Sequence, residues 1–187
     1  AKRQSFIDNA LTPMLRRYKA HPHILAWEVM NEPEWAMTIE GGGTVGQPVP
    51  REAMQEFVHV IVQSVEENAP QQLVTVGSAS RKWLELWKES ELDFYQYHYY
   101  DWMESETPFD VHYDQLGLDK PSILGEFPTK NSNINVDTYL EKAWSNYLAG
   151  ALGWSFRAGD QYSGFSCQPF TEWRQAHPDA PVDIRCP

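Results

Sequence analysis

Trp27-Glu28-Val29-Met30-Asn31-Glu32-Pro33 is a largely apolar run that ends in a carboxylate and is closed by a proline. Ile123-Leu124-Gly125-Glu126-Phe127-Pro128 repeats this pattern later in the chain. Proline ends a strand because it cannot donate a ladder hydrogen bond. A barrel of parallel strands presents its functional groups at the C-terminal ends of those strands. The two stretches therefore predict a parallel sheet that carries Glu32 and Glu126 on one rim.

Helix and strand patterns alternate along the rest of the chain. Apolar residues at helical spacing predict helices at 3–20, 50–65, 83–89 and 136–148, with weaker candidates at 111–116 and 170–175. Short apolar runs predict strands at 24–31, 73–76, 94–99, 121–127 and 152–156. Such alternation without hairpin signals indicates a parallel sheet with right-handed crossovers. We expect an α/β fold with about five parallel strands and helices outside, whereas a closed barrel needs eight strands.

The two periodicities also predict which residues are buried. In the helix at 136–148 the inward face should consist of Val136, Leu140, Ala143, Trp144, Tyr147 and Leu148, with Gly150 as its stop signal. Glu28 precedes Glu32 by four residues, so strict alternation aims both at one face and makes Glu28 a buried acid. Such an acid needs a partner, which the sequence does not identify. The loop at 34–49 is long enough to suggest a functional role.

Composition limits the class of protein. A length of 187 residues suits one domain, which we predict to span 1–187. The formal net charge of -11 disfavours nucleic acid and anionic membranes as partners. We expect no membrane span, because no run of about 18 apolar residues occurs. A nucleotide-binding sheet is disfavoured, since no glycine-rich phosphate motif follows the first strand.

Aromatic residues and cysteines each leave two alternatives open. The chain has eight Trp and nine Tyr, which fits sugar-stacking platforms or large core side chains. Cys167 and Cys186 either form a disulfide, which would favour secretion, or stay reduced. The sequence does not otherwise separate a secreted protein from a cytoplasmic one. We expect no zinc site at these cysteines, because no His/Cys cluster of ligand spacing surrounds them.

Two carboxylates on one rim can cut a glycosidic bond. A retaining glycosidase uses one carboxylic acid to protonate the leaving oxygen and one carboxylate to attack the anomeric carbon, about 5–5.5 Å apart. Glu32 and Glu126 are the candidates for these roles, and the alternative for each is an exposed acid beside a turn proline. This mechanism requires no cofactor and no metal ion.

Four motifs occur in a fixed order along the chain: Asn31-Glu32-Pro33, Tyr97-His98-Tyr99-Tyr100, Gly125-Glu126-Phe127 and Gly153-Trp154. In this order they resemble the clan A retaining glycoside hydrolases, closest to family 5, which includes cellulases, mannanases and related β-glycosidases. The resemblance covers residues 20–158. It implies an incomplete TIM-type barrel equivalent to strands 4–8, acting on a β-linked oligosaccharide or a small β-glycoside.

The resemblance also implies a role for each matched residue. Glu32 corresponds to the acid/base and Glu126 to the nucleophile. Asn31 would bind the sugar 2-hydroxyl, and His98 and Tyr100 would flank the two carboxylates.

Three tryptophans are further substrate-binding candidates. The resemblance implies that Trp154 is the platform under the reacting sugar, although a core position is the alternative. Trp35 and Trp102 lie in loops that follow strands on the same predicted rim, so their rings could contact more distant sugars.

The chain departs from this family in one respect. Three βα units that precede the first strand in the family have no counterpart here, nor do an Arg near the nucleophile and a His or Asn at the sugar site. Five strands would leave two bare sheet edges. We favour a homodimer that covers the open side. Alternatively the tail or leading helix covers it, or polar groups such as Gln96 face water there.

Two functional alternatives to the enzyme remain open. One is a non-catalytic carbohydrate-binding or assembly protein derived from a glycosidase barrel. The other is a chain that works only with a companion supplying the missing strands. The presence of two acids argues against a protein that only binds sugar, whereas the missing βα units argue for one.

Overall fold

The computed structural model describes residues 2–157, 159–164 and 166–180. The contacts divide the chain into two units. Unit 1 comprises the described residues of Ala1–Gln96 and Asp119–Pro121, and unit 2 those of Tyr97–Leu118 and Ser122–Pro187. The single catalytic domain expected for 1–187 stays a prediction.

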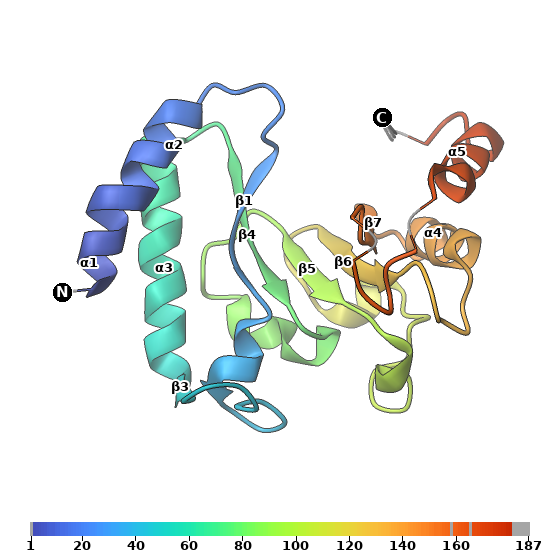
Figure 1. Cartoon of the computed structure of the whole chain (residues 1–187), viewed down its shortest axis with the longest axis horizontal. Helices are drawn as coiled ribbons and strands as arrows, with labels where there is room; N and C mark the ends of the chain where they lie inside the picture. Colours follow the sequence, from blue (N-terminus) through green and yellow to red (C-terminus); the bar gives the residue numbers. More distant parts are fainter. Residues whose placement is uncertain (1, 158, 165, 181–187) are drawn as a thin grey trace. The chain divides into compact units, whose positions relative to one another are not determined.

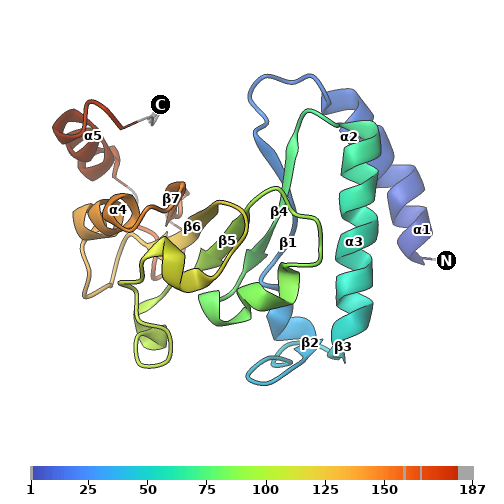
Figure 2. The same ribbon diagram turned by 180° about the vertical axis from the view of Figure 1, so that it is seen from behind.

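In unit 1 a long helical segment precedes the first strand (Figure 1). It consists of α1 (Lys2–Phe6), a π-helical turn (Ile7–Leu11) and α2 (Thr12–Tyr18), which confirms the predicted helix. The widened turn lies directly before Pro13, which cannot donate to the helical ladder. This segment runs beside α3 (Arg51–Asn68) in both views (Figure 2). The apolar residues that α3 buries all have the predicted helical spacing: Met54, Val58, Ile61, Val62 and Val65.

The strands of unit 1 pair in parallel. β1 (Ala26–Asn31) lies beside β4 (Leu73–Ser78), and α3 packs against β1. The expected loop after Pro33 contains more structure than predicted. A 3-10 turn at Pro33–Ala36 leads into a small parallel sheet of β2 (Met37–Thr38) and β3 (Val49–Pro50). A 3-10 helix, η3 (Arg81–Trp87), follows β4.

Unit 2 is built on a second parallel strand pair. Its regular elements are β6 (Ser122–Pro128), α4 (Val136–Ser145), β7 (Gly150–Trp154) and α5 (Cys167–Ala176), with 3-10 turns at Asp101–Met103 and Tyr113–Leu116. α4 packs on β6, β7 and α5 (Figure 1). Phe127 stacks on Tyr139 with ring centroids 4.7 Å apart, and Phe109 meets the same ring edge-on at 4.7 Å.

β5 (Tyr95–His98) contributes its first two residues to unit 1 and its last two to unit 2. The five strands form one sheet in the order β1-β4-β5-β6-β7. Each strand therefore neighbours the next long strand in the chain, as βα repeats require. The predicted fold class, an incomplete TIM-type barrel with about five parallel strands, is confirmed.

The register slips at a corresponding place in both strand pairs. Residues 28–31 of β1 pair with 75–77 of β4, and residues 124–127 of β6 pair with 151–153 of β7. Each first stretch has one residue more than its partner, which is a β-bulge. A bulge interrupts the alternation of side chains and re-aims those that follow it.

Two predicted environments are wrong. Glu28 is exposed rather than buried, because it lies in β1, which has a neighbouring strand on one side only in the described sheet. Glu28 Oε2 accepts a hydrogen bond from Gln96 Nε2 at 2.5 Å, which supplies the unidentified partner. Gln96 is only 3% exposed, so it does not face water as one alternative supposed.

The end of α4 also differs from the prediction. Trp144 and Tyr147, expected to point inward, are 42% and 73% exposed. The helix ends early because Tyr147 adopts a left-handed backbone, with φ of 61°, and Leu148 N–H then donates to the Ala143 carbonyl at 2.9 Å. Gly150 is therefore the first residue of β7 rather than a helix stop, and this strand lies two residues before its predicted position.

No helix in the described ranges is long and apolar enough to cross a membrane. The candidate Cys167–Cys186 disulfide falls outside the described residues, because Cys186 is not among them.

The backbone of Tyr147 yields a testable prediction. Tyr147→Gly and Tyr147→Ala both lose the ring contact with His112, whose centroid lies 5.2 Å away. Only glycine also relieves the positive φ, so the unfolding free energy of Tyr147→Gly should exceed that of Tyr147→Ala by about 1 kcal/mol. Urea denaturation of both variants measures the difference, and equal stabilities would contradict the assignment of this residue as the stop of α4.

Candidate active site

Glu32 follows the bulge of β1 and turns the chain with a left-handed backbone, φ 47° and ψ 50°. Its N–H donates to the Gly77 carbonyl at 2.6 Å, which ties the turn to β4. Trp35 Nε1 donates to Glu32 Oε2 at 2.9 Å, and the Trp35 ring packs edge-on against Trp83 with centroids 5.2 Å apart. Because a left-handed backbone costs a non-glycine residue about 1–2 kcal/mol, it persists only where surrounding contacts impose it.

Asn31 ends β1 with an exposed side chain that lies close to Gly77. A Cβ atom at position 77 would lie 3.2 Å from Asn31 Oδ1 and 2.9 Å from Glu28 Oε1. Glycine at this position therefore allows two polar side chains to approach the backbone of β4 closely.

Glu34 is a fully buried carboxylate two residues after Glu32. Its Oε1 accepts hydrogen bonds from Ser78 Oγ at 2.7 Å and Trp87 Nε1 at 2.8 Å, while Oε2 accepts from Ala79 N at 3.0 Å. Sequence reasoning missed this residue. Glu34 opens the segment predicted to be a loop, where an acid is usually solvated, and no periodicity signals its burial.

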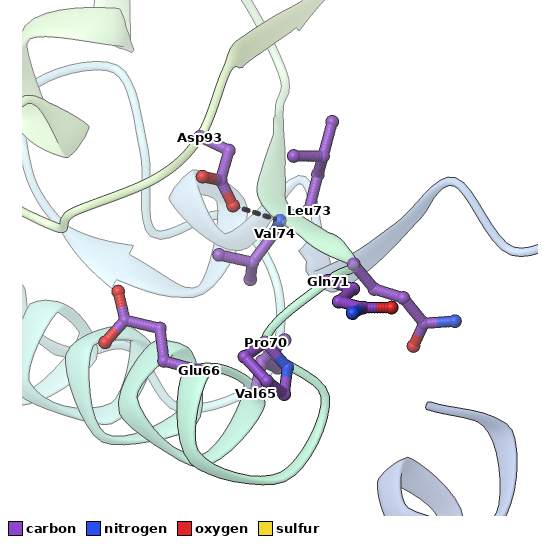
Figure 3. A pocket seen from close by; sticks show the side chains of 8 residues that line it. Val65, Glu66, Pro70, Gln71, Leu73, Val74 and Asp93 are labelled. Atoms are coloured by element: carbon purple, nitrogen blue, oxygen red, sulfur yellow. Dashed lines mark hydrogen bonds between the residues drawn. The ribbon is translucent and has the colours of Figure 1, made fainter. Parts of the chain in front are cut away.

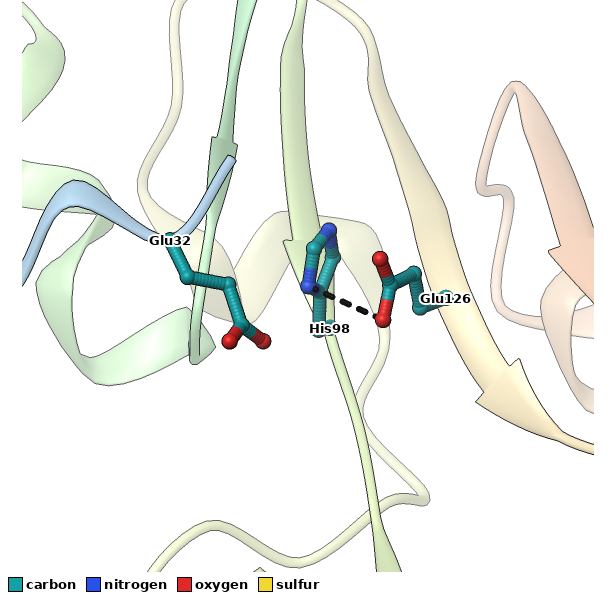
Figure 4. Close-up of side chains that lie close together, drawn as sticks. All are labelled: Glu32, His98 and Glu126. Atoms are coloured by element: carbon teal, nitrogen blue, oxygen red, sulfur yellow. Dashed lines mark ion pairs between the residues drawn. The ribbon is translucent and has the colours of Figure 1, made fainter. Parts of the chain in front are cut away.

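In unit 2, Glu126 lies within the bulge of β6 and is buried. Tyr100 Oη donates to Glu126 Oε2 at 2.8 Å. His98 Nδ1 lies 3.4 Å from the same oxygen (Figure 4). The Glu126 carbonyl accepts from Tyr99 N at 3.0 Å, which fixes β6 to the chain after β5. The structure thus brings both expected flanking residues, His98 and Tyr100, into contact with Glu126.

The predicted aromatic platforms have different surroundings. Trp154 ends β7 half-buried, and its Nε1 donates to Asp160 Oδ2 at 2.7 Å. This hydrogen bond, followed by one from the Tyr162 backbone, lowers the pKa of the Asp160 carboxyl below its ordinary value. Trp102 is 59% exposed in the turn after β5. Trp35 is half-buried, and its indole N–H contacts Glu32.

The same side chains could in principle ligate a cation. Within the part of the chain that the structure describes, Glu32, His98 and Glu126 are the one set of three residues with suitable ligand atoms. Imidazole and carboxylate groups suit zinc chemically, and they equally suit acid–base and nucleophilic chemistry. A chelator distinguishes the two uses.

A pocket of about 330 Å³ lies elsewhere in unit 1 (Figure 3). It is lined by the end of α3, the start of β4 and Asp93, whose Oδ2 accepts from Val74 N at 2.8 Å. This pocket is at the N-terminal end of β4, whereas Glu32 is tied to the C-terminal end of that strand. None of the predicted site residues lines it, so it is separate from the candidate chemistry.

Glu34 should make stability depend on pH. Burial raises the pKa of Glu34 above its ordinary 4.5, against the opposing effect of its hydrogen bonds. The folded state therefore holds this proton to higher pH than the unfolded chain does. The stability that the proton contributes is fully present below the ordinary pKa of 4.5 and is lost as pH rises through the raised pKa. Because glutamine does not titrate, the stability of Glu34→Gln relative to the parent should improve between about pH 4 and pH 7. Denaturation across this range measures it, and a pH-independent difference would contradict the expectation.

No family model matches the chain. The mannan endo-1,4-beta-mannosidase of Cryptopygus antarcticus is 30% identical over an alignment of 206 residues, gaps included, that covers 87% of this chain and 53% of that protein. The mannan endo-1,4-beta-mannosidase of Mytilus edulis is 28% identical over 192 residues, which cover 82% and 52% respectively. The chain thus spans about half the length of the curated relatives it matches.

Solved structures give the same result. The crystal structure of beta-1,4-D-mannanase from Cryptopygus antarcticus aligns with a TM-score of 0.81 at 27% identity, covering 91% of this chain and 57% of that one. The resemblance predicted from the four motifs is therefore confirmed, and this chain is similar over most of its length to about half of a family 5-like glycoside hydrolase of clan A.

Proposed function

We propose that this chain carries the two-carboxylate site of a retaining β-glycoside hydrolase whose substrate is β-1,4-linked mannan or its oligosaccharides. One observation carries the proposal. Glu32 directly follows the bulge of β1 and Glu126 lies within the bulge of β6, both at the C-terminal ends of strands in one sheet. The activity named for the relatives supports the substrate class.

In the first half-reaction Glu126 attacks the anomeric carbon while Glu32 gives its proton to the glycosidic oxygen. A bond from Glu126 to the sugar forms as the glycosidic bond breaks, and the leaving sugar departs as an alcohol. Tyr100 and His98 orient the attacking carboxylate through its Oε2 atom. A preorganised donor of this kind costs no reorganisation during the reaction.

In the second half-reaction Glu32 takes a proton from water, and the water oxygen attacks the anomeric carbon. The bond to Glu126 breaks, which restores the Glu126 carboxylate and leaves Glu32 protonated for the next cycle. Two successive inversions retain the configuration of the sugar.

The remaining predicted residues take supporting roles in this proposal. Asn31, exposed at the end of β1, binds the sugar 2-hydroxyl. Trp154 and Trp102 offer ring faces to pyranose units. Trp35 supports Glu32 through its indole N–H, and a contact of its ring with a more distant sugar stays a prediction.

A non-catalytic carbohydrate-binding protein is the second candidate. Trp102 favours it, because a ring that is 59% exposed can stack on a sugar without any bond being cut. β1 and β7 stand at the two ends of the strand order, and the homodimer expected to cover these edges stays a prediction. The mass of the chain alone in solution tests the homodimer. Its mass in the presence of a companion chain tests whether that chain supplies further strands.

Two variants test the enzyme. The parent, Glu126→Gln and Glu32→Gln are assayed on mannan and on aryl β-glycosides of mannose, glucose and xylose. We expect the parent to hydrolyse the mannosides, and Glu126→Gln to lose at least about 10³-fold because no glycosyl-enzyme forms. Azide should restore the turnover of an activated aryl mannoside by Glu32→Gln, since this anion attacks the glycosyl-enzyme without a general base.

Controls separate the rival functions. A chelator should leave the rate of the parent unchanged, whereas abolition of activity would assign a metal to the three-residue set. Equal background rates in all three proteins would remove the enzymatic function of this chain, and calorimetry with manno-oligosaccharides would then measure binding alone.

Tyr100 should matter for rate more than for binding. Tyr100→Phe removes a hydrogen bond to a carboxylate, worth about 1.5–3 kcal/mol, so kcat/KM should fall roughly 10- to 100-fold. Tyr95→Phe is the matched control, because Tyr95 Oη also donates to a carboxylate, Asp119 Oδ1, at 2.8 Å in unit 1. Equal losses in the two variants would mean that Tyr100 only stabilises the fold.

A further inference from the structure

Glu34 connects three segments of unit 1 around the turn that carries Glu32. Its carboxylate accepts from Ser78 and Ala79 at the end of β4 and from Trp87 in η3. Its backbone carbonyl accepts from Gly43 N at 3.2 Å in the segment between β2 and β3. The end of β4, a 3-10 helix and a loop are thus joined to this turn through one residue.

A carboxyl group fits these contacts better than an amide. Trp87 Nε1 donates to Oε1 and Ala79 N donates to Oε2, so both oxygens accept an N–H, whereas a glutamine amide can accept at only one of its two terminal atoms. The Ser78 hydroxyl lies 2.7 Å from Oε1 and 3.1 Å from the Ser80 carbonyl, so it can accept a proton from Glu34 while it donates to Ser80. The carboxyl group therefore keeps these contacts when it is protonated, in agreement with the pKa that burial raises.

The turn held in this way contains the strained residue. Glu32 has a left-handed backbone, and Trp35 N–H donates to the Glu32 carbonyl at 3.3 Å. The indole of Trp35 reaches back to Glu32 Oε2. Glu34 lies between these two residues, so its side-chain contacts fix both the backbone of the turn and the residue that holds the Glu32 carboxylate.

We propose that Glu34 is a positioning residue for the acid/base Glu32, acting through the 32–36 turn and Trp35. This inference rests on the proposed function. Glu34 does not contact substrate in this role. It keeps the Glu32 carboxylate where its proton reaches the leaving oxygen.

Leaving-group dependence provides the test. A phenol of low pKa leaves without protonation, whereas a sugar alcohol does not, and general acid catalysis contributes about 10²–10⁴-fold where it is needed. Glu34→Gln should therefore lower kcat/KM about 100-fold for manno-oligosaccharides and unactivated aryl β-mannosides, but less than about 5-fold for a dinitrophenyl β-mannoside. A steeper dependence of kcat/KM on the pKa of the leaving phenol is the expected result.

A matched control removes the effect of lost stability. Gln72 is also buried in unit 1, where it accepts from Trp27 Nε1 and donates to the Tyr18 carbonyl, near the opposite end of β4. Gln72→Leu should lower the melting temperature without changing the leaving-group dependence. If Glu34→Gln does not fold, Trp87→Phe removes one donor to Glu34 and should produce a smaller change in the same direction.

The outcomes are distinct. A uniform loss across all leaving groups in Glu34→Gln or Trp87→Phe, or the same steepening in Gln72→Leu, would overturn the positioning role and leave the proposed function intact. A parent without activity on any of these glycosides would overturn both.

Discussion

The directions of the Glu32 and Glu126 side chains depend on one extra residue in each of two strands, β1 and β6. In a parallel strand with regular alternation, the direction of the first side chain determines the direction of the last one. In β1 and in β6 a bulge breaks that alternation just before or at a glutamate. The side chains before the bulge can then pack on the sheet without determining the direction of the side chain at the strand end. This separation allows an acid to stand at the end of an otherwise largely apolar strand.

Each glutamate is then held by a different kind of support. Glu32 has a left-handed backbone whose N–H donates to the Gly77 carbonyl, and the buried Glu34 in the same turn accepts from the end of β4 and from η3. Glu126 is held by side chains, since Tyr100 and His98 contact one of its oxygens directly. These supports are compatible with the roles proposed for the two residues, an acid/base that exchanges a proton and a nucleophile that attacks from one direction.

The chain spans about half the length of the mannanases it matches. Both glutamates, their supports and the candidate platforms Trp154 and Trp102 all lie in the part described here. Within the described residues β1 and β7 end the strand order, so each has a neighbouring strand on one side only. A strand added at either edge would place further side chains beside the proposed sugar site.

The sequence by itself determined the order of the main helices and strands, the parallel sheet and the placement of two glutamates towards strand ends, because these follow from local periodicity and from short motifs. It could not determine the bulges, since a register exists only relative to a partner strand. It also misplaced Glu28, Trp144 and Tyr147. Tyr147 has a left-handed backbone that no pattern marks, and Trp144 meets Trp173 of α5 edge-on while remaining partly exposed. The burial of Glu34 was decided by tertiary structure alone, because its three donors come from residues more than forty positions away.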